Sequence, residues 1–166
     1  MSSLNQIFNE MRQFRTFKGG TRDILKYPPL KVYTLVWTGW AGTKQIMFKS
    51  EVESSDGTRR LSSILFNGVE YLENQNASHP FRIKIDDDFF FAALPTKDNQ
   101  CAVRCSCPDA YYRWGHNLYN HKSWIGPRPS FIVKGTGYPQ NPLNKMGICK
   151  HLWALIQMLE EGGVLR

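Results

Sequence analysis

The chain has 166 residues and a mass of 19.2 kDa, which is the size of one ordinary domain. Hydrophobic residues make up 42% of it and aromatic residues 13%, a composition that excludes a disordered or collagen-like chain. The 21 Lys and Arg residues exceed the 14 Asp and Glu residues, for a formal net charge of +7. A polyanionic partner is compatible with this charge, and so is an ordinary mixed surface, because no run of five like charges occurs.

No apolar stretch approaches the roughly 20 residues that a membrane span needs, and the mean hydropathy is -0.42. The first 17 residues are polar and amphipathic and lack the apolar core of a secretory signal. We therefore expect a soluble protein of a reducing compartment, with no membrane partner.

The first predicted element is an amphipathic helix over residues 3–17. Its apolar side chains recur at the i, i+3, i+4 spacing of a helix with one buried face. Ser2 or Ser3 can cap its start, and Gly19 and Gly20 end it. We expect the apolar face to pack on its own domain, with docking on a partner subunit as the alternative.

Residues 30–94 are predicted to be rich in β-strands. Strand-forming or alternating segments cover residues 31–40, 44–54, 59–66 and 81–94. Asp56-Gly57 and Asn67-Gly68 are signals of tight turns between strands. The acidic triplet at residues 86–88 is interpreted as a turn or bulge rather than a cation site, because successive strand side chains point to opposite faces. Residues 102–107 are predicted to add one more strand.

A long insert separates this region from a second predicted helix. Residues 108–146 are rich in Pro, Gly, Asn and Trp and show little periodicity, so we predict irregular structure. Five aromatic residues between Tyr111 and Trp124 argue against disorder. Residues 149–161 carry an apolar stripe typical of a helix, which Gly162 and Gly163 end.

Four cysteines lie at the ends of these predicted elements. Cys105 and Cys107 lie at the end of the last predicted strand, and Cys149 and His151 begin the last predicted helix. A disulfide framework would suit a small secreted domain, but nothing in the chain signals secretion. Thiolate and imidazole ligands together favour tetrahedral zinc, and four protein ligands favour a structural site. Cys101 is interpreted as a buried strand thiol, with a fifth ligand as the alternative.

The order Cys-x-Cys, then Cys-x-His, then an apolar helix resembles the SWIM-type zinc finger. The segments Cys-Ser-Cys-Pro-Asp at 105–109 and Cys-Lys-His-Leu-Trp-Ala-Leu at 149–155 are similar to its two halves. The resemblance implies one Zn²⁺ on a strand–hairpin–helix unit, held by Cys105, Cys107, Cys149 and His151. The spacer of 41 residues, 108–148, is longer than the usual spacer of that family.

The same two segments, with the Tyr/Arg/Trp stretch after the first, are also similar to small structural proteins of tailed bacteriophages. This resemblance implies a non-enzymatic virion component of the tail, baseplate or head, which is made in the host cytoplasm and binds other structural proteins. The alternative implied by the SWIM resemblance is a cytoplasmic nucleic-acid-binding module. Phosphate-loop, nucleophile-elbow, zincin and dinucleotide motifs do not occur. We therefore expect no enzyme and no small-molecule substrate.

Aromatic and basic residues cluster after the first ligand pair. Such a mixture can stack bases and contact phosphates, can form the hot spots of a protein interface, or can pack the insert onto the zinc unit. The group comprises Tyr111, Tyr112, Arg113, Trp114, Lys122, Trp124, Arg128 and Lys134. His116, Asn117 and His121 give a weaker hypothesis of a metal nuclease, beside the simpler interpretation of hydrogen-bonded loop residues.

The fold class that we expect is α+β. An N-terminal helix and a mainly antiparallel β core cover residues 1–100. A zinc-clamped strand–insert–helix unit covers residues 101–166, and the two parts are expected to form one compact domain.

Overall fold

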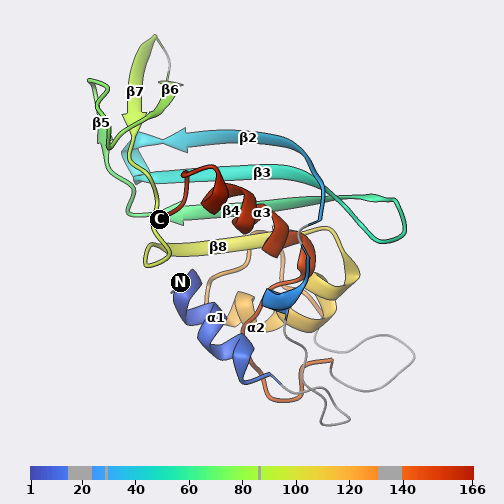
Figure 1. Cartoon of the computed structure of the whole chain (residues 1–166). Helices are drawn as coiled ribbons and strands as arrows, with labels where there is room; N and C mark the ends of the chain where they lie inside the picture. The colour runs from blue at the N-terminus through green and yellow to red at the C-terminus, as the bar shows by residue number, and fades with distance from the viewer. Residues whose placement is uncertain (15–23, 29, 86, 131–139) are drawn as a thin grey trace.

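A computed structural model describes residues 1–14, 24–28, 30–85, 87–130 and 140–166 (Figure 1). The larger sheet, sheet A, has the strand order β1-β8-β4-β3-β2. Its strands are β1 Ser2–Ser3, β2 Val32–Trp40, β3 Gln45–Glu53, β4 Arg59–Asn67 and β8 Gln100–Cys105. Neighbouring strands in sheet A are antiparallel, so the predicted α+β class with a mainly antiparallel core is confirmed.

The β3–β4 hairpin forms where the sequence predicts it. Gly57 has a φ of 77° and its N–H donates to the carbonyl of Ser54 at 2.9 Å, as the tight turn requires. On one face of the hairpin the alternating side chains are buried, including Ile46, Phe48 and Ile64. These side chains make the inner face of sheet A one side of the hydrophobic core.

The second predicted turn, at Asn67-Gly68, leads out of sheet A. Gly68 has the expected positive φ of 72°, but the chain then enters a separate sheet B with the order β5-β7-β6. Its strands are β5 Tyr71–Leu72, β6 Phe81–Ile85 and β7 Asp88–Ala92. Within the predicted segment 81–94, Ile85 lies opposite Asp88, so a turn separates β6 from β7 as expected. Asp86 lies outside the described residues.

Helix α1, Leu4–Arg12, is shorter than the predicted helix over residues 3–17. Ser3 caps it through a capping box with Gln6, because each side chain bonds the backbone N–H of the other residue. Phe14 lies beyond the helix end, yet it is buried and packs edge-on against Trp114 at 4.7 Å between ring centroids. Apolar periodicity therefore marked Phe14 correctly as core but not as helix. Residues 15–17 and the expected stop at Gly19 and Gly20 lie outside the described residues.

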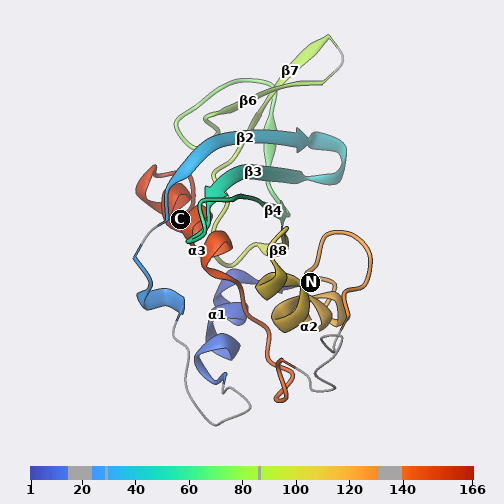
Figure 2. The same cartoon turned by 90° about the vertical axis from the view of Figure 1, so that its right-hand side faces the viewer.

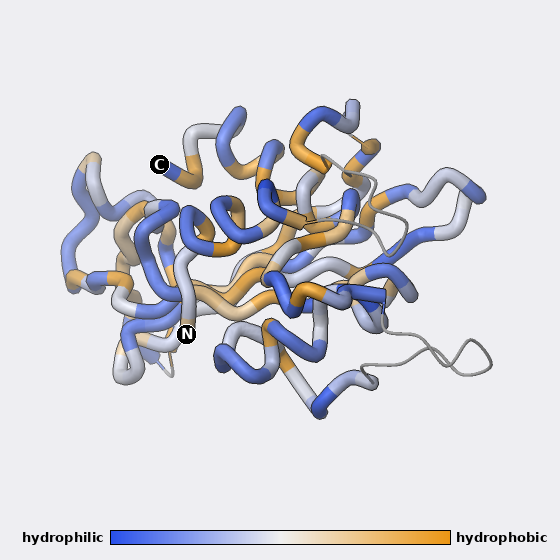
Figure 3. Tube along the Cα trace, turned by 90° about the horizontal axis from the view of Figure 1, so that it is seen from below, coloured by the Kyte–Doolittle hydropathy of each residue, from blue (hydrophilic) through white to orange (hydrophobic). Residues whose placement is uncertain are grey.

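Helix α3, Lys150–Glu161, lies against the strands β2, β3, β4 and β8. Figures 1 and 2 show α1 and α3 on the same side of sheet A. Figure 3 shows hydrophobic residues gathered between these layers and hydrophilic residues along the outside. The buried face of α3 includes Leu152, Leu155 and Leu159, so the predicted apolar stripe forms the helix–sheet contact.

The insert is more regular than predicted. A π-helix, Ala110–Gly115, runs directly into the short helix α2, His116–Asn120. Short 3₁₀ turns occur at Ile24–Lys26 and Ala41–Thr43. Strand β8 crosses the expected division at residue 101 and pairs with both β1 and β4, so residues before and after it share one sheet. Among the described helices, none has the length and apolar character to cross a membrane.

Candidate metal centre

The structure brings together the four residues that the resemblance implies as ligands. One ligand atom from each of Cys105, Cys107, Cys149 and His151 lies within 4.8 Å of all the others, and all four side chains are buried. In the part of the chain that the structure describes, this is the one cluster of His, Cys, Asp and Glu side chains able to hold a metal ion.

Two elements from opposite ends of the insert position these ligands. Cys105 is the last residue of β8, and Cys107 follows one residue later in the turn. Cys149 caps the N-terminus of α3 with an extended backbone, and His151 lies in the first turn of the helix. The N-terminal end of a helix favours negative charge, so a metal-bound Cys149 thiolate would be well placed there.

The donor set fits a divalent cation that prefers sulfur and nitrogen. Both ring nitrogens of the buried His151 lack a hydrogen-bond partner, although buried polar atoms ordinarily have one. A metal ion bound to one of these two nitrogens would give that atom a partner. The cluster is therefore able to hold a metal ion.

The pKa values of the Cys105 and Cys149 thiols are shifted in opposite directions. Hydrogen bonds from Cys107 and Cys149 lower the pKa of the Cys105 thiol to about 3. Burial, followed by the proximity of Cys105 and Cys107, raises the pKa of Cys149 well above its usual value. Without a cation the raised pKa of Cys149 keeps its thiol protonated at neutral pH. A coordinated metal would deprotonate this thiol, because it supplies the compensating positive charge.

Two further groups donate hydrogen bonds to the sulfurs. The hydroxyl of Ser62 donates to Sγ of Cys105 at 3.5 Å, and the backbone N–H of Ala110 donates to Sγ of Cys107 at 3.3 Å. Such donors hold metal ligands in place and reduce their charge. The sequence alone did not indicate Ser62, because its role depends on the β4–β8 register that sets it opposite Cys105.

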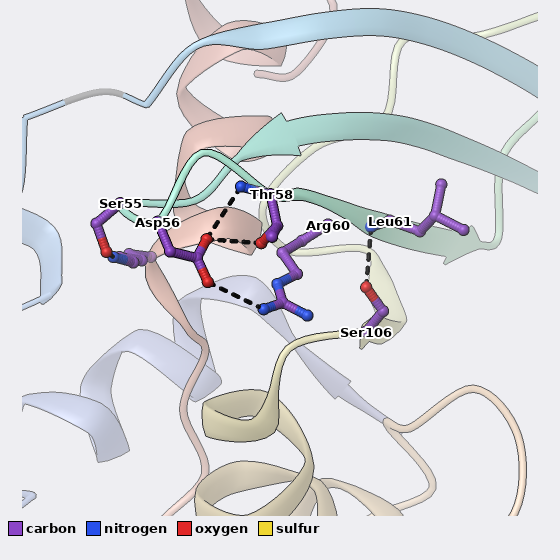
Figure 4. A network of polar contacts seen from close by, with 7 residues as sticks. Ser55, Asp56, Thr58, Arg60, Leu61 and Ser106 are labelled. Carbon is purple, nitrogen blue, oxygen red and sulfur yellow. Dashed lines mark hydrogen bonds and ion pairs between the residues drawn. The ribbon is translucent and has the colours of Figure 1, made fainter.

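The β3–β4 hairpin carries polar contacts that reach both ligand segments, at Ser106 and at Lys150 (Figure 4). The carboxylate of Asp56 accepts hydrogen bonds from the backbone and hydroxyl of Thr58 and pairs with Arg60 at 3.5 Å. Nζ of Lys150, the residue between Cys149 and His151, donates to the hydroxyl of Ser55 at 3.0 Å. The hairpin turn is thus bonded to the second ligand segment.

Two of the expected contact residues belong to the core instead. Trp114 is fully buried and Trp124 is 7% exposed, so neither can contact a partner on the surface. Trp114 fills the space between Phe14 and Gly147, where an added Cβ would come within 2.6 Å of the indole ring. Trp124 is held by a bridge to Val103 and by the hydrogen bond from its Nε1 to the carbonyl of Pro127.

The other expected contact residues have mixed environments. Tyr111, Lys122 and Arg128 are exposed, and the Arg128 guanidinium lies 6.0 Å from the ring centroid of the exposed Tyr119. Tyr112 and Arg113 are half-buried, and Arg113 forms an ion pair with Asp109. Lys134 lies outside the described residues.

The remaining polar candidates do not join the cluster. Cys101 is fully buried in β8, and burial raises the pKa of its thiol to about 12, so it is a core thiol as interpreted. His121 is exposed, His116 is half-buried, and neither is part of the metal-binding cluster. Asn117 is buried and its side chain donates to the carbonyl of Lys145 at 3.2 Å.

Comparison with known proteins places the chain in no family. No protein-family model, no curated protein and no solved structure matches it. The fold and the cluster therefore define the class only broadly, as an α+β protein with a buried Cys₃His group able to hold a metal ion.

Proposed function

We propose that the cluster binds one structural Zn²⁺ and that the protein is a non-enzymatic assembly subunit. The observation that carries this proposal is the closed set of four buried protein ligands. A zinc ion with four protein ligands has no open position for water or substrate, which is typical of structural rather than catalytic sites.

The ion would act as a clamp. Cys105 and Cys107 would hold it from the end of β8, and Cys149 and His151 from the start of α3, so it would close the intervening residues 108–148 into a loop. Structural zinc contributes on the order of 10 kcal/mol of apparent binding free energy, which becomes folding free energy where the unfolded chain lacks the site. The clamp would keep the insert and its exposed side chains in a fixed position.

A fixed insert suits a subunit that docks on neighbours. Its exposed surface retains Tyr111, Tyr119 and Arg128, and Tyr and Arg are among the residues enriched in interface hot spots. The similarity of both ligand segments to small structural proteins of tailed phages supports a virion component. The rival proposal of a nucleic-acid-binding SWIM module on this same surface is weakened, because the two buried tryptophans are not available to stack on bases.

The location of the protein in particles tests this proposal. Particles would be purified from an infected host by density-gradient centrifugation, and the chain would be detected in each fraction with an antibody. We expect it to sediment with the particles and to stay bound at moderate salt. A chain that stays entirely in the free-protein fractions would contradict the assembly role, without affecting the metal site.

A further inference from the structure

The outer face of sheet A carries a basic hollow beside the Cys105–Cys107 turn. The hollow has a volume of about 300 Å³ and is lined by Lys49, Leu61, Ser62, Ser63, Arg104 and Ser106. We propose that this hollow binds a phosphate group of single-stranded nucleic acid. The proposal does not depend on the assembly role.

The strand register places the basic residues Lys49 and Arg104 on either side of Ser63. Lys49 on β3 lies opposite Ser63 on β4, and Ser63 lies opposite Arg104 on β8. Since neighbouring strands are about 4.8 Å apart, the backbones of Lys49 and Arg104 are roughly 10 Å apart. An anion seated over Ser63 would face an ammonium group on one side and a guanidinium on the other.

Neither cation is neutralised within the described part of the chain. Lys49 and Arg104 are both exposed, and no ion pair involves either of them among the described residues. The carboxylate one row away on the same face, Glu51, is already paired with Arg59 at 3.0 Å. The hollow therefore keeps a positive charge that an anion can neutralise.

Arg104 is also held in position. Its Nη1 donates to the carbonyl of Ile125 at 3.1 Å. Gly126, with a φ of 102°, leaves room for the guanidinium, because an added Cβ would lie 2.0 Å from Nη1. A guanidinium has five N–H donors, so most of them remain for a ligand, and a fixed fork loses little freedom when it binds phosphate.

The surroundings of the hollow favour single-stranded nucleic acid over an acidic protein segment or a duplex. Val36 lies opposite Lys49 and is 55% exposed, and Trp40 lies further along the same face and is 40% exposed. Unpaired bases stack on exposed aromatic side chains such as that of Trp40, while basic residues contact the phosphate backbone of the nucleic acid. A duplex keeps its bases stacked internally and would leave Trp40 without a role.

The test is binding of a fluorescent oligothymidylate of about 20 nucleotides, followed by anisotropy over a salt series. The variant Lys49→Gln/Arg104→Gln removes both charges. The hollow takes one phosphate, and each neutralised phosphate contributes a slope of about 0.7 in log K against log salt for single strands. The variant should therefore bind roughly fivefold more weakly near 0.1 M salt, with a slope smaller by about 0.7. Trp40→Ala should weaken binding roughly fivefold with an unchanged slope, as expected for one lost stacking contact.

The matched control is Lys84→Gln/Arg12→Gln, which removes two exposed charges that do not line the hollow. It should bind nearly as the wild type, and circular dichroism should show that both double variants are folded. The proposal is overturned if the wild type does not bind the oligonucleotide at low salt, or if both double variants lose affinity equally. It is also overturned if a poly-glutamate peptide or a duplex of the same length competes better than unlabelled oligothymidylate.

Discussion

Ser106 and Leu61 exchange two hydrogen bonds beside the metal-binding cluster. The N–H of Leu61 donates to the hydroxyl of Ser106 at 3.0 Å (Figure 4), and the N–H of Ser106 donates to the carbonyl of Leu61 at 2.9 Å. Ser106 is the residue between Cys105 and Cys107, so these bonds extend the β4–β8 pairing past the end of β8. The Cys-x-Cys turn is therefore held by the sheet before any ion binds.

Ser62 supports the same turn from the inner face. We predict that Ser62→Ala lowers the zinc affinity about tenfold, because loss of a hydrogen bond to a metal ligand typically costs at least that much. Competition with a chromogenic chelator measures the affinity. The matched control is Ser63→Ala, whose side chain lies on the opposite face of β4 and should leave the affinity unchanged. Equal affinities for wild type and Ser62→Ala would show that the Ser62–Cys105 bond does not support the site.

Gly39 lies where sheet B packs on sheet A. An added Cβ there would come within 2.0 Å of Cδ1 of Ile83 and 2.3 Å of the Tyr71 hydroxyl. We predict that Gly39→Ala lowers the free energy of unfolding by about 1–3 kcal/mol, as overpacking usually does. Urea denaturation measures this change. Gly42→Ala is the control, since an added Cβ at Gly42 meets no atom within 4 Å; similar losses in both variants would rule out a specific clash.

Tyr71 links the two sheets by donating its hydroxyl to the carbonyl of Gln45 at 2.5 Å. We predict that Tyr71→Phe lowers the free energy of unfolding by about 1 kcal/mol near neutral pH, the usual net contribution of one hydrogen bond. Urea denaturation of the wild type and the variant at neutral pH measures this difference.

The same residue predicts a dependence on alkaline pH. Burial raises the pKa of Tyr71 from 10.0 to about 12, so the folded state holds the proton more tightly than the unfolded state. The stability contributed by this proton is complete below pH 10 and is lost as the pH rises through 12. Unfolding curves at increasing pH should show this loss in the wild type and a smaller one in Tyr71→Phe. Parallel losses in both proteins would assign the titration to another group.

Much of the fold could be predicted from local sequence signals. Asp56-Gly57 specifies a turn by its backbone preference, and alternation placed Ile46 and Phe48 on the inner face, so the β3–β4 hairpin follows from nearby residues. The four cluster residues could be predicted because a sulfur and nitrogen donor set at those spacings has few other uses.

The parts that could not be predicted depend on contacts between distant residues. Periodicity extended the first helix past Arg12, but tertiary packing uses Phe14 outside the helix, against Trp114. Aromatic composition left open whether Trp114 and Trp124 contact a partner or pack the insert, and the fold buries both. The basic hollow depends on the β3–β4–β8 register, which brings together Lys49 and Arg104 although they are 55 positions apart in the sequence.

The zinc content of the purified chain tests the central claim most directly. Elemental mass spectrometry would be applied to protein prepared without chelator, for the wild type, Cys149→Ser and Cys101→Ser. We predict one zinc per chain in the wild type and in Cys101→Ser, whose thiol lies outside the cluster, and loss of zinc in Cys149→Ser. A folded wild type without metal, or equal zinc content in all three proteins, would contradict the zinc clamp.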